Sequence, residues 1–287
     1  MADQAQPLRD YVQEVQRRAR VIAVTSGKGG VGKTSTSVNL AIALAAQEKR
    51  VVVIDADLGL ANVEVLLGLN SLYNLQSVID GEKALCQILV QGPGGIELVP
   101  GSSGIAKLAD LGPQARQNVL SGLDELQQKA DFIIIDTMAG IGQNTVSFCV
   151  AADEVLLVTT PEPSAIVDAY AMIKTISNVR DDVSIRMVVN MAANEEQARA
   201  VANKLNRVSQ QYLNRQLSCL GYIFRDPHVS QAVMQSYPFI LRFPAASAAK
   251  CIHALATRVI HQRVENRQGR SGFLRRFAET IGLASSA

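Results

Sequence analysis

The sequence predicts an α/β fold in which a doubly wound, mainly parallel sheet is flanked by helices. Short runs rich in Val and Ile are too continuously apolar to be strands with one solvated face, so each is expected to be buried on both faces. Helix-like stretches alternate with most of these runs, which is typical of parallel strands joined by crossover helices. A glycine-rich loop lies between the first run and the first helix-like stretch. The expected strands are residues 21–25, 51–55, 96–99, 132–136, 154–159, 185–190 and 220–224. The clearest expected helices are residues 34–47, 113–129, 164–177 and 195–212.

Length and composition fit one large α/β domain with short appendages. The chain has 287 residues, of which 48% are hydrophobic, so it can bury a sizeable core. No apolar run reaches the roughly 18 residues of a membrane span, and the N-terminus lacks the pattern of a secretory signal. Four cysteines are widely spaced without a CxxC pair, which favours reduced thiols in a cytosolic protein. They are Cys86, Cys149, Cys219 and Cys251.

Charge divides the chain into three parts: an N-terminal segment (1–20), a main domain (21–265), and a linker with a final helix (266–287). Residues 258–287 carry six arginines against two glutamates, a net charge of +4. Residues 1–20 carry a net charge of +1, which leaves −3 for residues 21–257. A basic tail on a slightly acidic body indicates that the tail meets an anionic partner.

The glycine-rich loop GKGGVGKT satisfies the phosphate-binding pattern G-x-x-x-x-G-K-[ST] through Gly27, Gly32, Lys33 and Thr34. Glycines let backbone N–H groups approach phosphates, and the following helix presents its positive dipole end. Lys33 is expected to reach the β- and γ-phosphates, and the Thr34 hydroxyl to ligate Mg²⁺. The alternative is a glycine-rich turn without a ligand. The expected nucleotide contacts in the loop are Gly29, Gly30, Val31, Gly32, Lys33, Thr34 and Ser35.

A lysine directly after the first glycine adds a family signal. Lys28 in KGGVGKT resembles the deviant Walker A loop of the MinD/ParA ATPases, and the resemblance extends over almost the whole chain. It implies a P-loop NTPase fold of the MinD type. It also implies that Lys28 reaches across a homodimer interface, where two protomers close over two ATP molecules. A cation supplied in this way would stabilise charge on the transferring phosphoryl group. The alternative for Lys28 is a solvated surface lysine.

Carboxylates at the ends of two expected strands would complete the site. The strand 51–55 ends in Asp55-Ala56-Asp57, which resembles the first switch of the family. The resemblance gives Asp57 the attacking water and Asp55 a role in supporting Mg²⁺ through its water shell. Both acids are also suitable helix-capping residues, which is the alternative.

The second switch follows a run of four apolar residues that ends in Asp136, the Walker B pattern. Asp136 is expected to hold a Mg²⁺-bound water. Gly140, four residues further on, is expected near the γ-phosphate. Met138 departs from the family, whose members usually have a small residue or Pro at this position.

The base is expected to be adenine, because the chain lacks the NKxD-type motif with which a GTPase of this class reads guanine. The resemblance places Asn190, at the end of the strand 185–190, and the turn Asp226-Pro227 beside the adenine. An ordinary turn role is the alternative for Asn190. The expected cofactors are therefore ATP and Mg²⁺.

The tail is predicted to be a short amphipathic helix over residues 273–283. At about 100° per residue, aromatic and aliphatic side chains lie on one side and charged ones on the other, although Leu283 breaks the division. Such a helix suits the surface of an anionic bilayer, and two copies on a dimer would bind better than one. The alternative is a terminal helix packed on the domain or on a partner. The expected membrane-contacting residues are Phe273, Leu274, Phe277, Ile281, Arg275 and Arg276.

The N-terminus identifies a branch of the family. DQAQPLR fits the DQAxxLR segment of the FlhG (FleN/YlxH) family, and the run PEPSAIVDAY at 161–170 and the basic tail agree with it. This resemblance implies a slow regulatory ATPase at the inner face of the cell membrane, at a pole, that sets flagellar number and placement. Its implied partners are the flagellar GTPase FlhF, a flagellar transcription regulator and basal-body C-ring proteins. The alternative is an ordinary chain terminus. The residues expected to contact FlhF are Asp3, Gln4, Ala5, Leu8 and Arg9.

Two other functions use a similar core. A cell-division-site regulator of the MinD type or a DNA-partition ATPase of the ParA type is the main alternative, although the amphipathic tail argues against nucleic acid as a partner. An iron–sulfur carrier of the related class would bring paired cysteines to a dimer axis, and the four scattered cysteines disfavour it.

Overall fold

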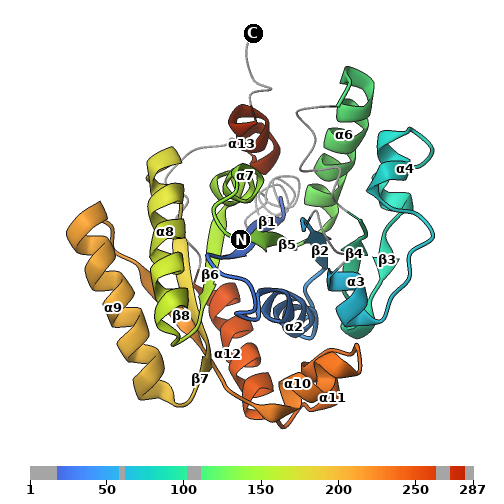
Figure 1. The fold of residues 1–287 in the computed structure, drawn as a ribbon. Coiled ribbons are helices and arrows are strands. Elements are labelled where there is room, and N and C mark those ends of the chain that lie inside the picture. Colours follow the sequence, from blue (N-terminus) through green and yellow to red (C-terminus); the bar gives the residue numbers. More distant parts are fainter. Residues whose placement is uncertain (1–17, 58–61, 102–110, 263–271, 282–287) are drawn as a thin grey trace, which may run out of the picture.

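The structure, a computed structural model, describes residues 18–57, 62–101, 111–262 and 272–281. Within these residues the chain forms an eight-stranded sheet in the order β3-β4-β2-β5-β1-β6-β7-β8 (Figure 1). All neighbouring strands are parallel except the β3–β4 pair. The predicted fold class is therefore confirmed. The strands are β1 (Arg20–Ser26), β2 (Val51–Asp55), β3 (Val90–Gln91), β4 (Glu97–Val99), β5 (Phe132–Ala139), β6 (Glu154–Thr159), β7 (Ile185–Ala192) and β8 (Ser218–Phe224).

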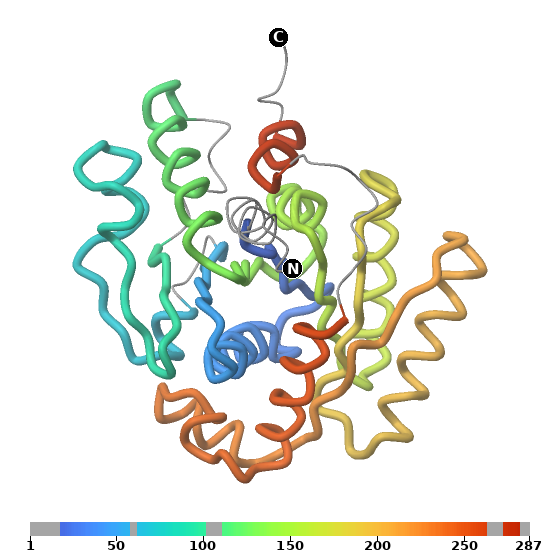
Figure 2. Tube along the Cα trace, turned by 180° about the vertical axis from the view of Figure 1, so that it is seen from behind, coloured from blue at the N-terminus to red at the C-terminus, as the bar shows by residue number. Residues whose placement is uncertain are grey.

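Helices cover both faces of the sheet, and each face has its own hydrophobic core. On one face lie α4 (Leu75–Ile79), α6 (Pro113–Lys129), α7 (Gln143–Ala151), α8 (Pro163–Val179), α9 (Glu195–Leu213) and α13 (Phe273–Thr280). On the other lie α2 (Lys33–Ala45), α3 (Asn62–Leu67), α10 (Pro227–Met234), α11 (Phe239–Arg242) and α12 (Ser247–His261). Figures 1 and 2, which view the molecule from opposite sides, show α2 and α12 on one side of the sheet and α7 and α13 on the other.

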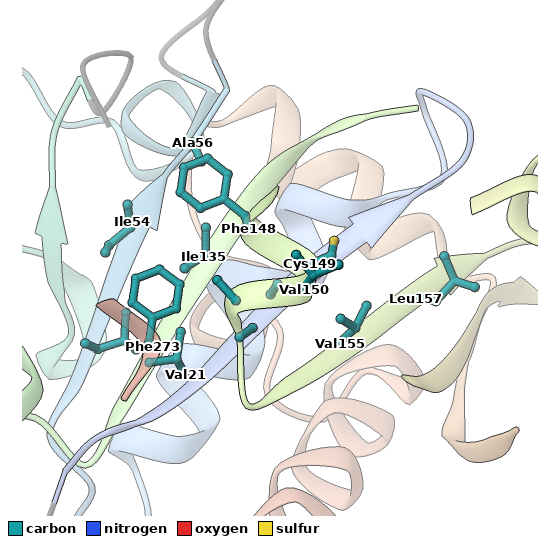
Figure 3. Packing of buried hydrophobic residues seen from close by; sticks show 14 of the residues in the cluster. Val21, Ile54, Ala56, Ile135, Phe148, Cys149, Val150, Val155, Leu157 and Phe273 are labelled. Atoms are coloured by element: carbon teal, nitrogen blue, oxygen red, sulfur yellow. The ribbon is translucent and has the colours of Figure 1, made fainter. Parts of the chain in front are cut away.

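The central strands are buried on both faces, which explains their continuous apolar sequence. In β1, Val21 and Ala23 point into one core, and Ile22 and Val24 point into the other. The side chains of β5 alternate in the same way (Figure 3 shows its Ile135 in the first core). A charged residue at any of these positions would be buried without a partner, so the sequence must be apolar at consecutive positions.

The segment between β2 and β5 is more broken than the sequence predicts. The sequence predicts one strand there, at 96–99, and one helix, at 113–129. Among the described residues of this segment, the structure adds the short helices α3 and α4, two 3-10 turns and the edge strand β3. The turns are η1 (Leu85–Gln87) and η2 (Pro93–Gly95). Elements of two to six residues are too short to leave a periodic pattern.

The sheet topology brings the predicted site together. Parallel strands end at the same edge, and β1, β5 and β2 are neighbours. In the register, Asp136 is the partner of Val24 in β1 and of Asp55 in β2. The loop after β1 and the two predicted switches therefore meet at the carboxyl edge of the sheet. In the part of the chain that the structure covers, no helix is both long and apolar enough to cross a bilayer.

Candidate functional site

The glycine-rich loop is shaped by close packing and by left-handed backbone. A Cβ on Gly27 would lie 2.1 Å from the carbonyl oxygen of Asp168, so only glycine fits there. Gly30 and Gly32 have φ angles of 77° and 85°, which L-residues rarely adopt. The helix α2 begins at Lys33, immediately after Gly32, and receives no side-chain cap. Its N-terminal N–H groups therefore suit an anionic ligand.

Asp136 joins the residues that the sequence assigns to phosphate and metal binding. Its carboxylate lies 3.0 Å from Nζ of Lys33. It also accepts hydrogen bonds from the hydroxyls of Thr34 (2.6 Å) and Ser37 (2.7 Å). Ser37 was missed by the sequence reasoning, although it lies one helical turn after Lys33 on α2. The structure thus places the loop lysine, the loop threonine and the Walker B aspartate in direct contact.

One loop side chain is without a partner. The hydroxyl of Ser35 is buried and has no hydrogen-bond partner in the part of the chain that the structure describes. A buried polar group usually has one, so an orphaned hydroxyl at this position fits a site built for a polar ligand.

Asp55 is buried beside Asp136, and burial raises its pKa to about 7. This pKa is the net result: the charge of Asp136 adds to the effect of burial, whereas hydrogen bonds from the N–H groups of Val63 and Asp57 oppose it. Both N–H groups lie 3.1 Å from the carboxylate. The Asp55 carboxylate thus accepts from the first turn of α3, as the alternative of a helix-capping role predicts. A carboxyl that is this reluctant to ionise would gain a counter-charge from a cation, and its metal role stays a prediction.

The first switch is described in part. Asp57 is half-buried, and its carboxylate accepts a hydrogen bond of 2.9 Å from the side-chain amide of Asn62. Residues 58–61 lie outside the described part of the chain. The role of Asp57 toward an attacking water stays a prediction.

The second switch packs against the loop. The N–H of Gly140, which has a φ of 90°, donates to the carbonyl of Ser26, at 2.8 Å. Met138 is half-buried at the end of β5, and its carbonyl accepts from the Thr145 hydroxyl. The unusual side chain therefore sits where the switch turns into α7.

Lys28 is partly exposed, but its ammonium is held by contacts within its own chain. Its ammonium donates to the carboxylate of Glu162 at 2.7 Å and to the hydroxyl of Ser164 at 2.9 Å. Hydrogen bonding to Lys28 lowers the pKa of Glu162. Both partners belong to the run PEPSAIVDAY, which sequence reasoning used only as a family signal, without a role for Glu162. In the single chain the signature lysine is thus held by its own protomer, and its contact across a dimer stays a prediction.

The residues expected beside adenine already have protein partners. The side-chain amide of Asn190 donates to the carbonyl of Val31, at 2.8 Å. Asp226 caps α10 and accepts from Ser247 and Ala248 at the start of α12. Burial opposes ionisation of Asp226, but these hydrogen bonds prevail and lower its pKa. Both side chains thus have protein partners before any base is bound, as buried polar groups usually do, and the placement of Asn190 and of the turn Asp226-Pro227 beside the adenine stays a prediction.

A cavity of about 310 Å³ opens next to this region. It lies between the β6–α8 loop, which holds Lys28, and the ends of β7 and β8. Sequence reasoning assigned none of the lining residues to a ligand, although Pro161 and Glu162 belong to the run PEPSAIVDAY, and it named only the neighbouring turn of Asp226 and Pro227, where α10 begins. The lining residues are Thr160, Pro161, Glu162, Met191, Ala193, Gln197 and Arg225.

The tail helix α13 is packed on the domain. Phe273 and Phe277 are only 4% and 1% exposed, and the Phe277 ring stacks on Phe148 of α7 with centroids 4.9 Å apart. Arg276 is 8% exposed, and it donates to the carbonyl of Ala151 at 2.8 Å. Figure 1 shows α13 lying against α7, and Figure 3 shows Phe273 in the same core as Phe148.

This packing corrects the expectation of an exposed membrane helix in the single chain. Arg276 also pairs with Asp153, at 2.5 Å, so half of the basic pair is used internally. Leu274 and Ile281 pack at the edge of the core, and among the predicted membrane-contacting residues only Arg275 is well exposed. An apolar face this rich in aromatic residues is more stable against α7 than in water. The packed alternative therefore holds in this structure.

Some predicted features cannot be placed. The predicted FlhF contacts (Asp3, Gln4, Ala5, Leu8 and Arg9) and the linker residues 263–271 lie outside the described residues. All four cysteines lie inside them and are free thiols. Among the described side chains, no cluster of three or more His, Cys, Asp or Glu is placed to hold a metal ion.

Comparison with known proteins agrees with this site. Residues 19–191 match the AAA domain family. The antiactivator FleN of Pseudomonas aeruginosa is 42% identical over 240 residues, covering 84% of this chain and 86% of FleN. The flagellum site-determining protein YlxH of Helicobacter pylori is 38% identical over 205 residues, covering 71% of this chain and 69% of YlxH.

A solved structure agrees on the fold. The septum site-determining protein MinD of Pyrococcus horikoshii, complexed with Mg-ADP, superposes with a TM-score of 0.69 at 24% identity, covering 85% of this chain and 97% of MinD. Together with the loop GKGGVGKT, FleN and YlxH place the chain in the MinD/ParA family of P-loop ATPases, in the branch that contains these two proteins (FlhG).

Proposed function

We propose that this ATPase is a switch that controls the number and placement of flagella through ATP-dependent dimerisation and membrane association. The observation that carries the proposal is the contact of Lys33 and Thr34 with Asp136, together with a separately held Lys28, in a chain that is 42% identical to an antiactivator and 38% identical to a flagellum site-determining protein.

The residues present fit Mg-ATP. The uncapped start of α2, the orphaned Ser35 hydroxyl and the two buried carboxylates suit a triphosphate and its cation. Thr34 would ligate Mg²⁺, with Asp55 and Asp136 in its water shell. Bound Mg²⁺ neutralises charge on the β- and γ-phosphate oxygens. Lys33 would then move from Asp136 to the phosphates, because the bound cation would replace Lys33 in neutralising the Asp136 carboxylate.

Dimerisation would follow from Lys28. The Lys28–Glu162 pair is exposed, at 38% and 60% of the side chains, so it holds the lysine only weakly. A second protomer's triphosphate would offer more negative charge than Glu162. We infer that ATP draws Lys28 from its own chain into the partner's site, while Asp57 positions the water. Because this chemistry serves as a timer, turnover is expected to be slow.

Membrane association would require α13 to leave α7. Its apolar face is covered in the single chain, so exposure must be coupled to another event, and dimerisation is the natural one. A helix of eight residues is marginal in water, so one free copy would bind an anionic bilayer weakly and two would bind through avidity. The protein would then lie on the inner face of the cell membrane, at a pole.

The proposed partners follow from the branch of the family. The N-terminal segment would activate the flagellar GTPase FlhF, and other surfaces would contact a flagellar transcription regulator and C-ring proteins. A MinD-type division regulator is the second candidate, because the solved MinD structure shares the fold.

Size measurement and liposome sedimentation, in ADP and in ATP, test the switch. The full chain is expected to form dimers and to bind anionic liposomes only with ATP, whereas a chain that ends at Gly272 is expected to dimerise without binding. DNA sedimentation in ATP instead would favour a partition ATPase.

Complementation tests the flagellar role. Expression in a Pseudomonas aeruginosa strain that lacks FleN is expected to restore the normal number of flagella per cell. If the protein dimerises on liposomes with ATP but leaves the number of flagella in this strain unchanged, the flagellar role would be refuted and the ATPase assignment would remain intact.

A further inference from the structure

Asn190 connects the end of β7 to the phosphate loop. The residue is buried, at 8% exposure, and its Nδ2 donates to the carbonyl of Val31 at 2.8 Å. Its Oδ1 accepts from the N–H of Met191 at 2.9 Å. A carbonyl needs a donor and an N–H needs an acceptor, so these two partners fix the orientation of the amide. The side chain therefore forms a bridge between two backbone segments far apart in the sequence.

The Asn190 amide also packs against the next loop residue, Gly32. A Cβ on Gly32 would lie 2.3 Å from Nδ2 of Asn190 and 3.7 Å from the terminal methyl of Met191. Gly32 has a φ of 85° and directly precedes Lys33. The amide thus packs against the glycine whose left-handed backbone begins α2.

Met191 shows that this corner is held under strain. Its φ of 56° lies in the left-handed region, which is unfavourable for a residue with a Cβ. Such a conformation persists where surrounding contacts determine it, and the hydrogen bond from its N–H to Asn190 is one such contact. The strand end and the loop therefore support each other.

We propose that Asn190 is a positioning residue that clamps the phosphate loop in its binding shape before any nucleotide arrives. Val31 and Gly32 lie in the stretch whose N–H groups hold phosphates. Anchoring the carbonyl of Val31 fixes the peptide planes around it, so less order must be gained on binding. The clamp acts on the triphosphate and is indifferent to the base. This inference rests on nucleotide binding at the loop and is independent of the flagellar role.

The test compares Asn190→Ala with Asn194→Ala. Asn194 lies four residues further along the same connection and caps α9 by accepting from the N–H of Gln197, at 2.8 Å, without contacting the loop. Competition against a fluorescent ADP analogue with Mg²⁺ gives affinities for ATP and for inorganic tripolyphosphate. Asn190→Ala is expected to weaken tripolyphosphate binding about tenfold, which corresponds to 1.4 kcal/mol, and ATP binding by at least the same factor. Asn194→Ala is expected to change neither.

Hydrogen exchange of the nucleotide-free protein gives a readout without any ligand. The amides of residues 32–34 are expected to exchange faster in Asn190→Ala and to be unchanged in Asn194→Ala. If Asn190→Ala does not fold, Asn190→Asp keeps the acceptor for Met191 and removes the donor to Val31, and it should show the same faster exchange. Loss of ATP affinity with unchanged tripolyphosphate affinity and unchanged exchange would make Asn190 a base ligand and overturn the clamp. Equal losses in Asn194→Ala, or no change in Asn190→Ala, would overturn it too.

Discussion

Replacing Phe148 by alanine should undock α13 without changing the amino-acid sequence of that helix. The Phe148 ring stacks on Phe277 with centroids 4.9 Å apart, and its other surfaces pack in the core of the sheet. A buried Phe→Ala change costs about 3–5 kcal/mol. If about half of that, roughly 2 kcal/mol, comes from the contact with α13, the docking equilibrium shifts about 30-fold toward the free helix. The remainder lowers the free energy of unfolding of the whole domain.

Two measurements on Phe148→Ala separate these effects. Hydrogen exchange over residues 273–281 is expected to lose about 30-fold of its protection, whereas the central strands keep theirs under native conditions. Sedimentation with anionic liposomes in ADP is expected to rise above the wild-type level, because the membrane-binding residues are intact and free. Arg275→Ala is the control for the exchange measurement alone, since its exposed ion pair with Glu279 contributes little to docking, whereas Arg275 is itself a predicted membrane contact.

Unchanged protection of α13 in Phe148→Ala would show that the stack does not hold the helix. Lost protection without increased liposome binding in ADP would show that docking is not what keeps the protein off the membrane. The second result would remove the physical basis of the proposed link between α13 and the bilayer.

Three further predictions concern the nucleotide site. Lys33→Ala is expected to weaken ATP binding at least about hundredfold, because the charge-assisted contact with the phosphates is lost and the buried Asp136 is left without its cation. A near-normal ATP affinity in calorimetry would contradict the assignment of the loop. Glu162→Gln weakens the hold on Lys28 and is expected to strengthen ATP-dependent dimerisation by up to about fivefold, in keeping with an exposed ion pair, and weaker dimers in analytical ultracentrifugation would refute this. The pKa of Asp55 is raised to about 7 in the folded, metal-free protein, so the proton it holds stabilises the fold at low pH, and that stability is lost as pH rises through 7. Urea unfolding without Mg²⁺ is expected to give about 2 kcal/mol less stability at pH 8.5 than at pH 5.5 from this group, and Asp55→Asn should remove that difference.

The central sheet and the phosphate loop could be predicted because their signals are local. Strands buried on both faces must be apolar at every position, and the loop needs glycines where φ is positive, as at Gly30 and Gly32. The contact of Thr34 with Asp136 followed from parallel strands that end at one edge. The first two inferences use a constraint that is visible within a few neighbouring residues, and the third adds the rule that parallel strands end at one edge of a sheet.

The partners of exposed-looking groups could not be predicted in this way. The periodicity of residues 273–283 specifies an apolar face and leaves open whether lipid or protein covers it. The answer depends on Phe148, which lies in another part of the sequence. Likewise, the loop pattern specifies Lys28 but not its contact with Glu162, and the position of Asn190 at a strand end does not reveal its hydrogen bond to Val31.

The position of α7 relates the two ends of the proposed switch. This helix begins directly after Gly142, at the end of the second switch, and the same short helix carries Phe148 and the carbonyl of Ala151, which both hold α13. It has nine residues, a length of about 13 Å, and a packed helix this short moves as a unit. A shift of Gly140 toward a bound γ-phosphate would therefore displace the surface on which Phe277 stacks. Nucleotide exchange from ADP to ATP should then lower the hydrogen-exchange protection of residues 273–281 in the wild type and have little further effect in Phe148→Ala, whereas equal losses in both proteins would place the connection elsewhere.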